Sequence, residues 1–599
     1  MKIPSKQERR DFFRSLYEES KHKNAALYDR FDRAMRQYEG DSEIDNSTER
    51  ASAVRNITYE LIESQVSIEI PQPKAQAARY TEKNDRAARA IERLCLRVRD
   101  ELPFEKLNDL DERYTYIFGG SVWLVEWDEG IRRRHSTGGI RLSCIDPRDF
   151  VPEYGVSEVE DMEYCFLRFR TTKSELCRRF GITEEEAEQA EEPEGEKDEG
   201  GALVVVAFYR TEDGGVGRFV YSGDVTLSDL PDFYARKTEH CTKCSKERSE
   251  CLCQAPHFKT EEAWEEELNA PIRMEDGRVI PALSPETDEN GNLTGKMRRT
   301  KLPYYTPRRF PIVVRRSISV PGELFGRSDC DAIRPQQQQI NKLETRILQK
   351  LMRSGVTPML PDDAEITLNN TVFGQLIRLK PGDDRGQYGV LDTTPSIAQE
   401  IEQGARLYDQ AKRILGITDS FLGIGDNTAL SGVAKQVQVE QAAGRLQSKK
   451  RMKQAAYAEI DRLIFEYHLA YADENRPLTY HDAEGKLHAA VFCRYDFLEY
   501  DPEHGGYGWD DEFLFSVDQN GGIEQQRDVM WQKNLENLQA GTFGNPSLPG
   551  TLLHYWQCQE RVHYPYAREN VEYFRRLAQA QPQSIPPQQQ NKEQSTWQP

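Results

Sequence analysis

Apolar residues recur every three or four positions over much of the first hundred residues, a spacing that predicts amphipathic helices. One predicted helix spans residues 47–67, with Ile57 and Leu61 on its apolar side. A second spans residues 76–102. Residues 1–46 are charged and rich in helix-forming residue types, so we expect a helical arm ahead of these two helices.

The pattern then changes to strands. Residues 114–128 are rich in β-branched and aromatic side chains, and Gly119 and Gly120 mark an expected bend. Further strands are expected at 140–151, 162–171, 203–209 and 218–221, the last two as a hairpin. An acidic stretch at 183–201, expected to be a solvated loop, and a polar insertion at 235–300 interrupt this strand-rich region.

The second half of the chain has a different order of elements. We expect a helix over 331–353, short strands over 357–391, a helix over 396–415, a Gly-rich loop over 416–432 and a long helix over 431–470. At 1.5 Å per residue the long helix would measure roughly 60 Å. Strands at 476–518, three short helices between 523 and 578, and a Gln/Pro-rich disordered tail at 579–599 are expected to follow.

Short motifs accompany this order. The upstream ones are 118–121 (Phe-Gly-Gly-Ser), 127–128 (Trp-Asp) and 145–148 (Ile-Asp-Pro-Arg). Those before and within the first helix are 304–307 (Tyr-Tyr-Thr-Pro), 310–314 (Phe-Pro-Ile-Val-Val), 326–329 (Gly-Arg-Ser-Asp) and 338–341 (Gln-Gln-Ile-Asn). Those before the long helix are 415–421 (Leu-Gly-Ile-Thr-Asp-Ser-Phe) and 426–434 (Asp-Asn-Thr-Ala-Leu-Ser-Gly-Val-Ala). Over about residues 50–580, the insertion excepted, the chain resembles the portal proteins of tailed bacteriophages.

The resemblance implies an α+β, portal-type subunit. Its parts would be an N-terminal helical arm (1–46), a wing (47–327), a first stem helix (328–355), a clip (356–395), a second stem helix (396–415), a tunnel loop (416–431), a long spine helix (432–475), wing return strands (476–520), a helical crown (521–578) and a disordered tail (579–599).

The same resemblance implies what such a subunit does. It would form a dodecameric ring at one capsid vertex of the virion, assembled in the bacterial cytoplasm. Double-stranded DNA would pass through the ring non-specifically during packaging and ejection. The implied partners are the terminase large subunit, then head-completion or tail adaptor proteins, and the major capsid and scaffolding proteins. The chain itself would not be an enzyme.

The first stem helix is expected to carry two stripes of side chains. The apolar stripe is Ile340, Leu343, Ile347 and Leu351, and the basic stripe, expected to face the channel, is Lys342, Arg346, Gln349 and Arg353. A helix with these stripes suits a stem packed side by side around a channel. An ordinary surface helix shows the same pattern, so the position between wing and clip motifs is what favours a stem.

The predicted tunnel loop and the spine helix hold the other candidate DNA contacts. The loop residues are Gly423 and Gly425, which loosen the backbone, Phe421 and Leu422, which lack an evident core, and Asp419 and Asp426, which discourage phosphate binding. The spine residues are Arg445, Lys449, Lys450, Arg451 and Lys453. A packed helix–helix connection is the alternative for the loop. For the spine residues the alternatives are a solvated face or pairing with a neighbouring subunit.

Charge and composition limit the kind of DNA contact. The net charge is −20, which argues against a protein that wraps and neutralises DNA phosphates but not against a conduit. With 37% hydrophobic and 30% charged residues in 599, the chain is more polar than usual globular proteins, as expected of an elongated subunit. No apolar run is long enough to span a membrane, and the first residues lack a secretory signal, so we expect folding in a reducing cytoplasm.

Four of the 11 cysteines cluster within thirteen residues. They are Cys241, Cys244, Cys251 and Cys253, with His240 and His257 at either side. In a reducing compartment this spacing predicts a closed, structural zinc site, in which a histidine replaces one cysteine if the tight Cys251–Cys253 pair cannot supply both sulfurs. Four reduced, unbound thiols are the alternative.

No catalytic motif accompanies these features. The chain lacks the Gly-x-x-x-x-Gly-Lys-Ser/Thr phosphate loop of a packaging motor and the His-Glu-x-x-His and Gly-x-Ser-x-Gly motifs of hydrolases. A zinc-dependent nucleic-acid-processing enzyme, with the cysteine cluster as its working site, is the first alternative function. A zinc-containing DNA-binding protein that uses the basic run at 449–453 is the second.

Overall fold

The computed structural model describes residues 3–580 apart from several short segments. Those left out are 6–7, 42–52, 68, 80, 135, 194–199, 242–257, 275–276, 288–292, 354–355, 360–367, 372–373, 378–388, 393–395, 418–431, 482–486, 502–505, 519–521, 562–563 and 565–566. In parts of some helices and strands, 432–446 among them, the backbone alone is described. The chain divides into two compact units, one of residues 1–68, 73–478 and 491–517, the other of residues 69–72, 479–490 and 518–599.

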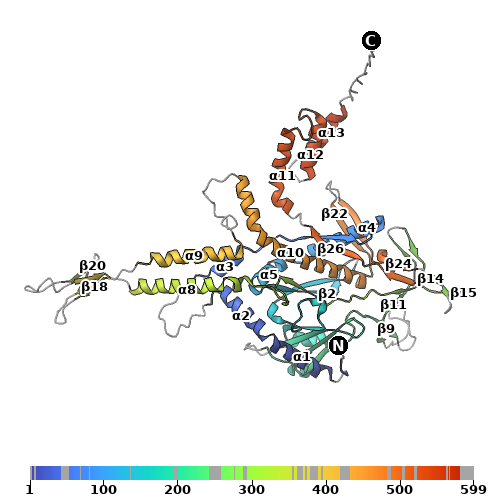
Figure 1. Ribbon diagram of the computed structural model, residues 1–599. Helices are drawn as coiled ribbons and strands as arrows, with labels where there is room; N and C mark the ends of the chain where they lie inside the picture. The colour runs from blue at the N-terminus through green and yellow to red at the C-terminus, as the bar shows by residue number, and fades with distance from the viewer. Residues whose placement is uncertain are drawn as a thin grey trace, which may run out of the picture. The chain divides into compact units, whose positions relative to one another are not determined.

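Two antiparallel sheets form the strand-rich part of the first unit (Figure 1). The larger has the order β4-β5-β6-β7-β8, from Phe150–Pro152, Tyr164–Thr172, Gly201–Arg210, Val216–Ser222 and Val225–Leu230. The smaller has the order β17-β2-β3, from Ile312–Arg316, Gly120–Arg132 and Thr137–Ile145. The strands predicted between residues 140 and 221 are therefore present, and the mixture of helices and strands is that of an α+β protein.

The amino-terminal helices belong to the core of this unit and do not form a separate arm. Helix α1 (Arg9–Lys23) packs Phe13 and Tyr17 onto the larger sheet. The Phe13 ring stacks on that of Phe219 in β7, with centroids 5.1 Å apart. Helix α2 (Ala25–Glu39) follows and ends at Gly40 in the left-handed conformation. The described part of residues 1–46 is thus helical, as predicted, and the aromatic side chains of α1 complete the core of the sheet.

The next three helices differ in part from the prediction. Only α3 (Ile57–Glu63) lies in the predicted helix at 47–67, whereas α4 (Glu82–Glu101) matches the second predicted helix. Helix α5 (Phe104–Phe118) occupies residues expected to begin a strand, and β2 starts only at Gly120.

Gly119 explains this boundary. It ends α5 with φ of 86°, and a side chain there would clash with the carbonyl oxygen of Gly326. The Gly119 carbonyl accepts from the amides of Ser317 and Gly326 at 2.9 and 3.0 Å. The Gly pair therefore marks a helix-to-strand junction and not a bend within a strand.

The order expected for the second half of the chain is present. Helix α8 (Asp329–Arg353) is followed by two antiparallel strand pairs, then α9 (Ala398–Leu415) and the 40-residue α10 (Gly432–Tyr471). The strand pairs are β18–β21 (Val356–Met359 with Gly389–Asp392) and β19–β20 (Leu368–Thr371 with Gly374–Ile377).

The acidic stretch and the insertion contain more regular structure than predicted. After α6 (Lys173–Phe180), the acidic stretch forms α7 (Glu184–Glu188), whose first turn is closed by a capping box between Thr183 and Glu186. The insertion folds into antiparallel pairs: β9–β10 (Arg236–Cys241, Phe258–Ala263), β11–β16 (Glu265–Glu267, Lys301–Pro303), β12–β13 (Ile272–Arg273, Val279–Ile280) and β14–β15 (Leu283–Thr287, Leu293–Arg299).

The remaining elements complete both units. The strands are β1 (Gln72–Ala77), which pairs with β26 (Phe513–Asp518), β22 (Arg476–His481), which pairs with β23 (Leu487–Phe492), and β24 (Leu498–Asp501), which pairs with β25 (Gly506–Trp509). In the second unit the three predicted helices are α11 (Gly522–Gln539), α12 (Pro549–Arg561) and α13 (Ala567–Ala580). The predicted tail from 581 onward lies outside the described residues.

Candidate functional site

Helices α8 and α9 pack side by side in antiparallel directions (Figure 1). Ile340 of α8 is fully buried against Leu407 and Ala411 of α9. Further along the pair, Lys350 of α8 donates to the carboxylate of Glu400 near the start of α9. The two helices thus form one hairpin whose connection contains the strands β18–β21.

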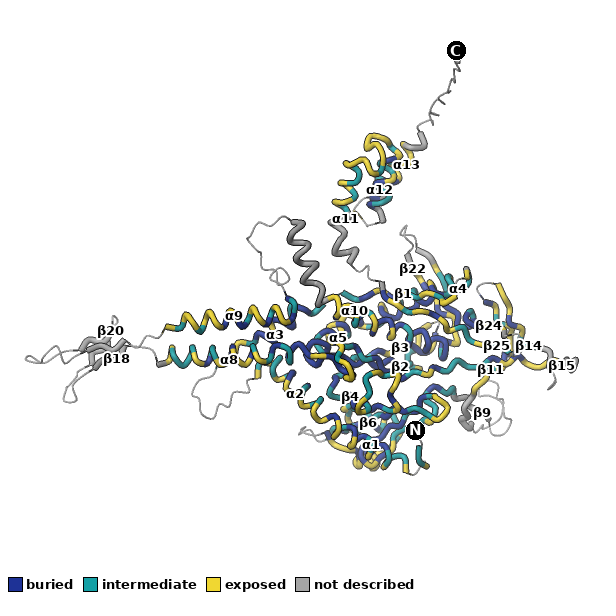
Figure 2. Tube along the Cα trace, in the orientation of Figure 1, coloured by how far each residue is buried: buried dark blue, intermediate teal, exposed yellow. Residues whose placement is uncertain are grey.

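Burial falls along α8 from its beginning to its end (Figure 2). Ile333 and Ile340 are fully buried, whereas Leu351 and Met352 are 49% and 65% exposed. On α9, Ile401 is 56% exposed. Of the predicted apolar stripe of α8, Ile340 is therefore buried, Leu343 and Ile347 are partly buried, and Leu351 is exposed. Exposed apolar side chains of both helices that lie near one another are typical of a surface that another molecule covers.

The predicted basic stripe of α8 lies beside helix α2. A cavity of about 680 Å³ is lined by residues of both helices, among them Arg33 and Arg36 of α2. Three residues of the stripe also line it: Lys342, Arg346 and Gln349. The side chain of Arg353 lies outside the described part of the chain. The stripe therefore contributes to a positively charged cavity, which attracts anions.

Helix α10 carries a buried polar stripe that the sequence pattern did not reveal. Lys449, Lys453, Tyr457 and Asp461 follow one another at intervals of four residues, so they lie on one side of the helix. All four are at most 5% exposed. The four-residue interval was visible in the sequence, but the residues that bind these four side chains lie far away along the chain.

Lys449 joins α10 to the first residue of α8. Its ammonium lies 2.7 and 2.9 Å from the two carboxylate oxygens of Asp329 and 3.0 Å from Oε1 of Gln65. Gln65 in turn donates to Asp329 at 3.0 Å. Asp329 is 2% exposed and begins α8, where the helix dipole favours a carboxylate. Helices α10 and α8 therefore share one buried ion pair.

Lys453 belongs to a second buried cluster one turn further on. Its ammonium lies 2.9 Å from Glu112 of α5, which also binds Arg315 of β17 at 2.8 Å. Arg315 binds Asp111 as well. Burial raises the pKa of Glu112, but Arg315 and Lys453 outweigh this effect and hold that pKa below its ordinary value. Burial lowers the pKa of Lys453, although Glu112 opposes the shift.

The other two residues of the stripe are also bonded. Tyr457 donates to Oδ1 of Asn108 at 2.9 Å. Asp461 accepts two hydrogen bonds from Arg99 of α4 at 2.7 and 2.8 Å. The stripe thus fixes α10 to α4, α5 and the start of α8 through buried polar contacts.

These contacts correct part of the predicted DNA-facing run on the spine helix. Lys449 and Lys453 are buried in ion pairs, so their side chains do not reach a surface that DNA can touch. Lys450 and Arg451 are exposed, and the side chain of Arg445 lies outside the described residues. For Lys450, Arg451 and Arg445 a contact with DNA stays a prediction.

The predicted tunnel loop falls almost wholly outside the described residues. Gly416 ends α9 in the left-handed conformation with φ of 79°. The six residues predicted to act in the loop are not described: Asp419, Phe421, Leu422, Gly423, Gly425 and Asp426. Their role remains a prediction.

The predicted zinc ligands lie at and beyond the end of one strand pair. In the β9–β10 pair, Cys241 stands opposite Phe258 and His240 opposite Lys259. This pairing brings the two ends of the segment 242–257 together, and that segment, with Cys244, Cys251, Cys253 and His257, is not described. Among the described residues, no group of three or more His, Cys, Asp or Glu side chains is arranged to hold a metal.

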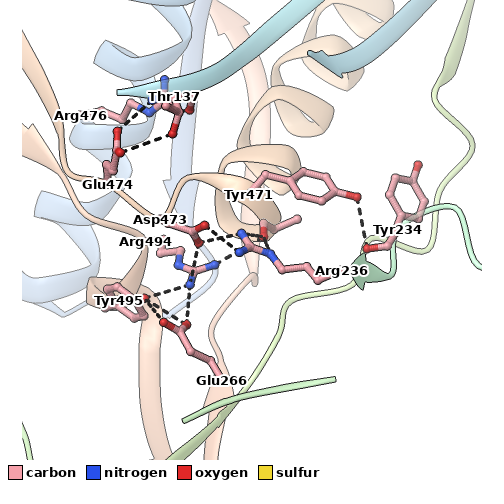
Figure 3. A network of polar contacts seen from close by, with 11 residues as sticks. Thr137, Tyr234, Arg236, Glu266, Tyr471, Asp473, Glu474, Arg476, Arg494 and Tyr495 are labelled. Atoms are coloured by element: carbon pink, nitrogen blue, oxygen red, sulfur yellow. Dashed lines mark hydrogen bonds and ion pairs between the residues drawn. The ribbon is translucent and has the colours of Figure 1, made fainter. Parts of the chain in front are cut away.

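A network of charged residues fixes the base of this strand pair to the end of α10 (Figure 3). Arg236, the first residue of β9, donates to the carbonyl oxygen of Ala470 at 2.7 and 3.0 Å and pairs with Asp473 at 2.7 Å. Arg494 binds Asp473 at 2.9 Å and Glu266 of β11 at 2.7 Å. The otherwise unpaired carbonyl at the helix end is thereby satisfied, and the cysteine-bearing strands have a fixed base.

No family model matches the chain, and no curated protein matches it. Among the described helices, none combines the length and the apolar character needed to cross a membrane. Function therefore has to be inferred from the chain's own residues and their arrangement.

Proposed function

We propose that this chain is the portal protein of a tailed bacteriophage, one subunit of a dodecameric ring at a capsid vertex. DNA would enter and leave through the ring, which would dock the terminase large subunit during packaging and adaptor or tail proteins afterwards. Capsid and scaffolding proteins would hold it during assembly in the host cytoplasm. The chain would act as a conduit and not as an enzyme, with ATP hydrolysis supplied by the terminase.

The observation that carries this proposal is the α8–α9 hairpin followed in the chain by the 40-residue α10. The hairpin is buried at its base and exposes Leu351, Met352 and Ile401 further along. In a ring, the same surfaces of neighbouring copies would cover such side chains. The ion pair between Lys449 and Asp329 gives the hairpin a fixed attachment to the long helix, as a mechanical hub requires.

The test is the mass of the purified full-length protein. A ring of several hundred kilodaltons is expected, against 69.1 kDa for one chain, by mass photometry or native mass spectrometry. The double variant Met352→Glu, Ile401→Glu is expected to shift the ring toward smaller species, because it places charges in an apolar interface. Tyr154→Glu, at a position 60% exposed in the loop before β5, serves as the control. A wild-type protein that stays monomeric at all concentrations contradicts the proposal.

We also propose that the segment beyond β9 binds one structural zinc ion. Four cysteines and two histidines lie within it or at its ends, and the β9–β10 pairing closes the segment at its base. Thiolate and imidazole are the ligands that zinc prefers, and a site of four such ligands leaves no open position for catalysis. Zinc would order a segment that has few apolar residues of its own.

Metal analysis tests this proposal. We expect about one zinc per chain in protein purified without chelators, falling close to zero in Cys244→Ser because a structural site needs all four ligands. Cys177→Ser is the matched control, since Cys177 lies outside the cluster on α6. Wild-type protein without zinc, or full zinc in Cys244→Ser, contradicts the site.

A further inference from the structure

The larger sheet has one face covered by α1 and a second face that is only partly covered. Side chains alternate along a strand, so Phe166 and Val205 face α1 while Leu167 and Val206 face the other way. Leu167, Val206 and Val220 stand in one row, because β5 pairs Leu167 with Val206 and β7 pairs Val220 with Val206. Helix α6 covers one end of this second face.

A cavity of about 170 Å³ lies on the second face beside α6 and the smaller sheet. Most of its wall is apolar: Leu124, Leu167, Phe169, Val206, Phe208 and Val220. A cavity of roughly 150 Å³ with such a lining is large enough to bind benzene. The space therefore fits one aromatic ring or a short branched aliphatic group.

Arg218 of β7 is one of the charged side chains that line the cavity, and it lies in the same sheet row as Phe208. It lies opposite Phe208, and its guanidinium carbon is 4.9 Å from the centre of the Phe233 ring. Its Nε atom is buried without a hydrogen-bond partner. None of the ion pairs formed within the described part of the chain includes Arg218. Arg218 as a residue is partly buried, but its Nε atom is buried, and leaving that donor unpaired costs free energy that a bound anion would offset.

The other charged groups of the cavity do not supply this anion. Glu175 is paired with Arg178, 2.8 Å away. Glu126 also lines the cavity, but in the described structure its carboxylate forms no ion pair with Arg218. Arg141 and Arg179 line it as well, so three arginines stand against two glutamates in the wall and the cavity carries a net positive charge.

We propose that this cavity binds a small organic carboxylate, with its ring or branched chain on the apolar wall and its carboxylate on Arg218. The guanidinium would donate from Nε, the atom that has no partner in the unliganded chain. The site is independent of the proposed portal function, since no residue of α8, α9 or α10 takes part in it.

Calorimetric titration of the full-length protein with phenylacetate tests the site, with phenylacetamide as the neutral ligand of the same shape. For a ligand of this size we expect saturable binding with Kd on the order of 1 mM or tighter. The Kd of phenylacetamide should be at least about 10-fold higher than that of phenylacetate, because the amide cannot form the charged hydrogen bond. Arg218→Gln should abolish this preference, and Val206→Trp should abolish binding by filling the cavity.

Arg14→Gln is the matched control, since Arg14 lies on α1 across the sheet and pairs with Asp224 at the surface. It should keep wild-type affinity for phenylacetate. The proposal is overturned if wild-type protein binds the acid and the amide equally, or does not bind phenylacetate at millimolar concentration. It is also overturned if Arg218→Gln, which leaves the apolar wall intact, retains the preference for the acid.

Discussion

Lys449→Met is expected to lower the free energy of unfolding by about 3–5 kcal/mol, because it leaves the Asp329 carboxylate buried without its cation. Asp329 is 2% exposed, so water cannot replace the ammonium. Gln65 still donates to it at 3.0 Å, but one neutral donor does not compensate a buried charge. Native-state hydrogen exchange at the first turns of α8 measures the loss where it occurs.

The neighbouring residue provides the control. Lys450→Met removes the same charge from an exposed position and should cost less than about 1 kcal/mol. Adding Asp329→Asn to Lys449→Met should recover most of the loss, because the buried charge is then gone. Equal costs for Lys449→Met and Lys450→Met would show that the ion pair does not hold α8 to α10.

This result also bears on how the proposed ring would work. The exposed end of the α8–α9 hairpin is where a docking partner would push, and Asp329 lies at its buried base. In the proposed ring, the connection from that base to α10 would transmit such a displacement to the helix that follows the predicted tunnel loop. Exposed pairs are worth little and break easily, whereas buried charge clusters have few alternative arrangements.

The order of the helices could be predicted because their apolar periodicity is long and regular. Helices α8, α9 and α10 begin and end within a few residues of the expected bounds. The strand predicted for residues 114–118 was wrong, because β-branched and aromatic side chains favour strands only where they pack on a sheet surface. Here Tyr116, Ile117 and Phe118 are buried on α5, whose end is set by Gly119 and not by local propensity.

The charged residues were less predictable than the apolar ones. Lys449 and Lys450 are adjacent and chemically identical in the sequence, yet one is 4% exposed and the other lies on the surface. Their difference comes from Asp329, more than a hundred positions away, which periodicity cannot reveal. In the same way Arg218 appeared as an ordinary strand residue, and only the cavity on its face of the sheet makes it a candidate ligand group.

Acid should destabilise the fold through His468, a buried residue of α10. Its Nδ1 lies 2.7 Å from the carbonyl oxygen of Ile464, and its ring packs edge-on against Trp127 at 5.4 Å. Burial lowers the pKa of His468 to about 3, and Arg476 and Arg133 act in the same direction. The unfolded chain, with an ordinary histidine pKa of about 6.5, takes up a proton that the folded chain refuses.

The contribution of neutral His468 to the free energy of unfolding is therefore fully present above pH 6.5. It is lost as the pH falls from about 6.5 toward 3, by on the order of 4 kcal/mol in total. Two buried acids act oppositely: burial raises the pKa of Asp461 to about 6 and that of Glu466 to about 7, so protonation favours their folded form. Because these effects offset one another in the wild type, the informative quantity is the difference in the free energy of unfolding between variant and wild type.

His468→Phe should gain stability relative to wild type as the pH is lowered from 7 to 4, measured by urea titration at each pH. His22→Phe, at an exposed position of α1, is the control. A parallel pair of profiles for His468→Phe and wild type would mean that His468 takes up its proton as readily in the folded chain as in the unfolded chain.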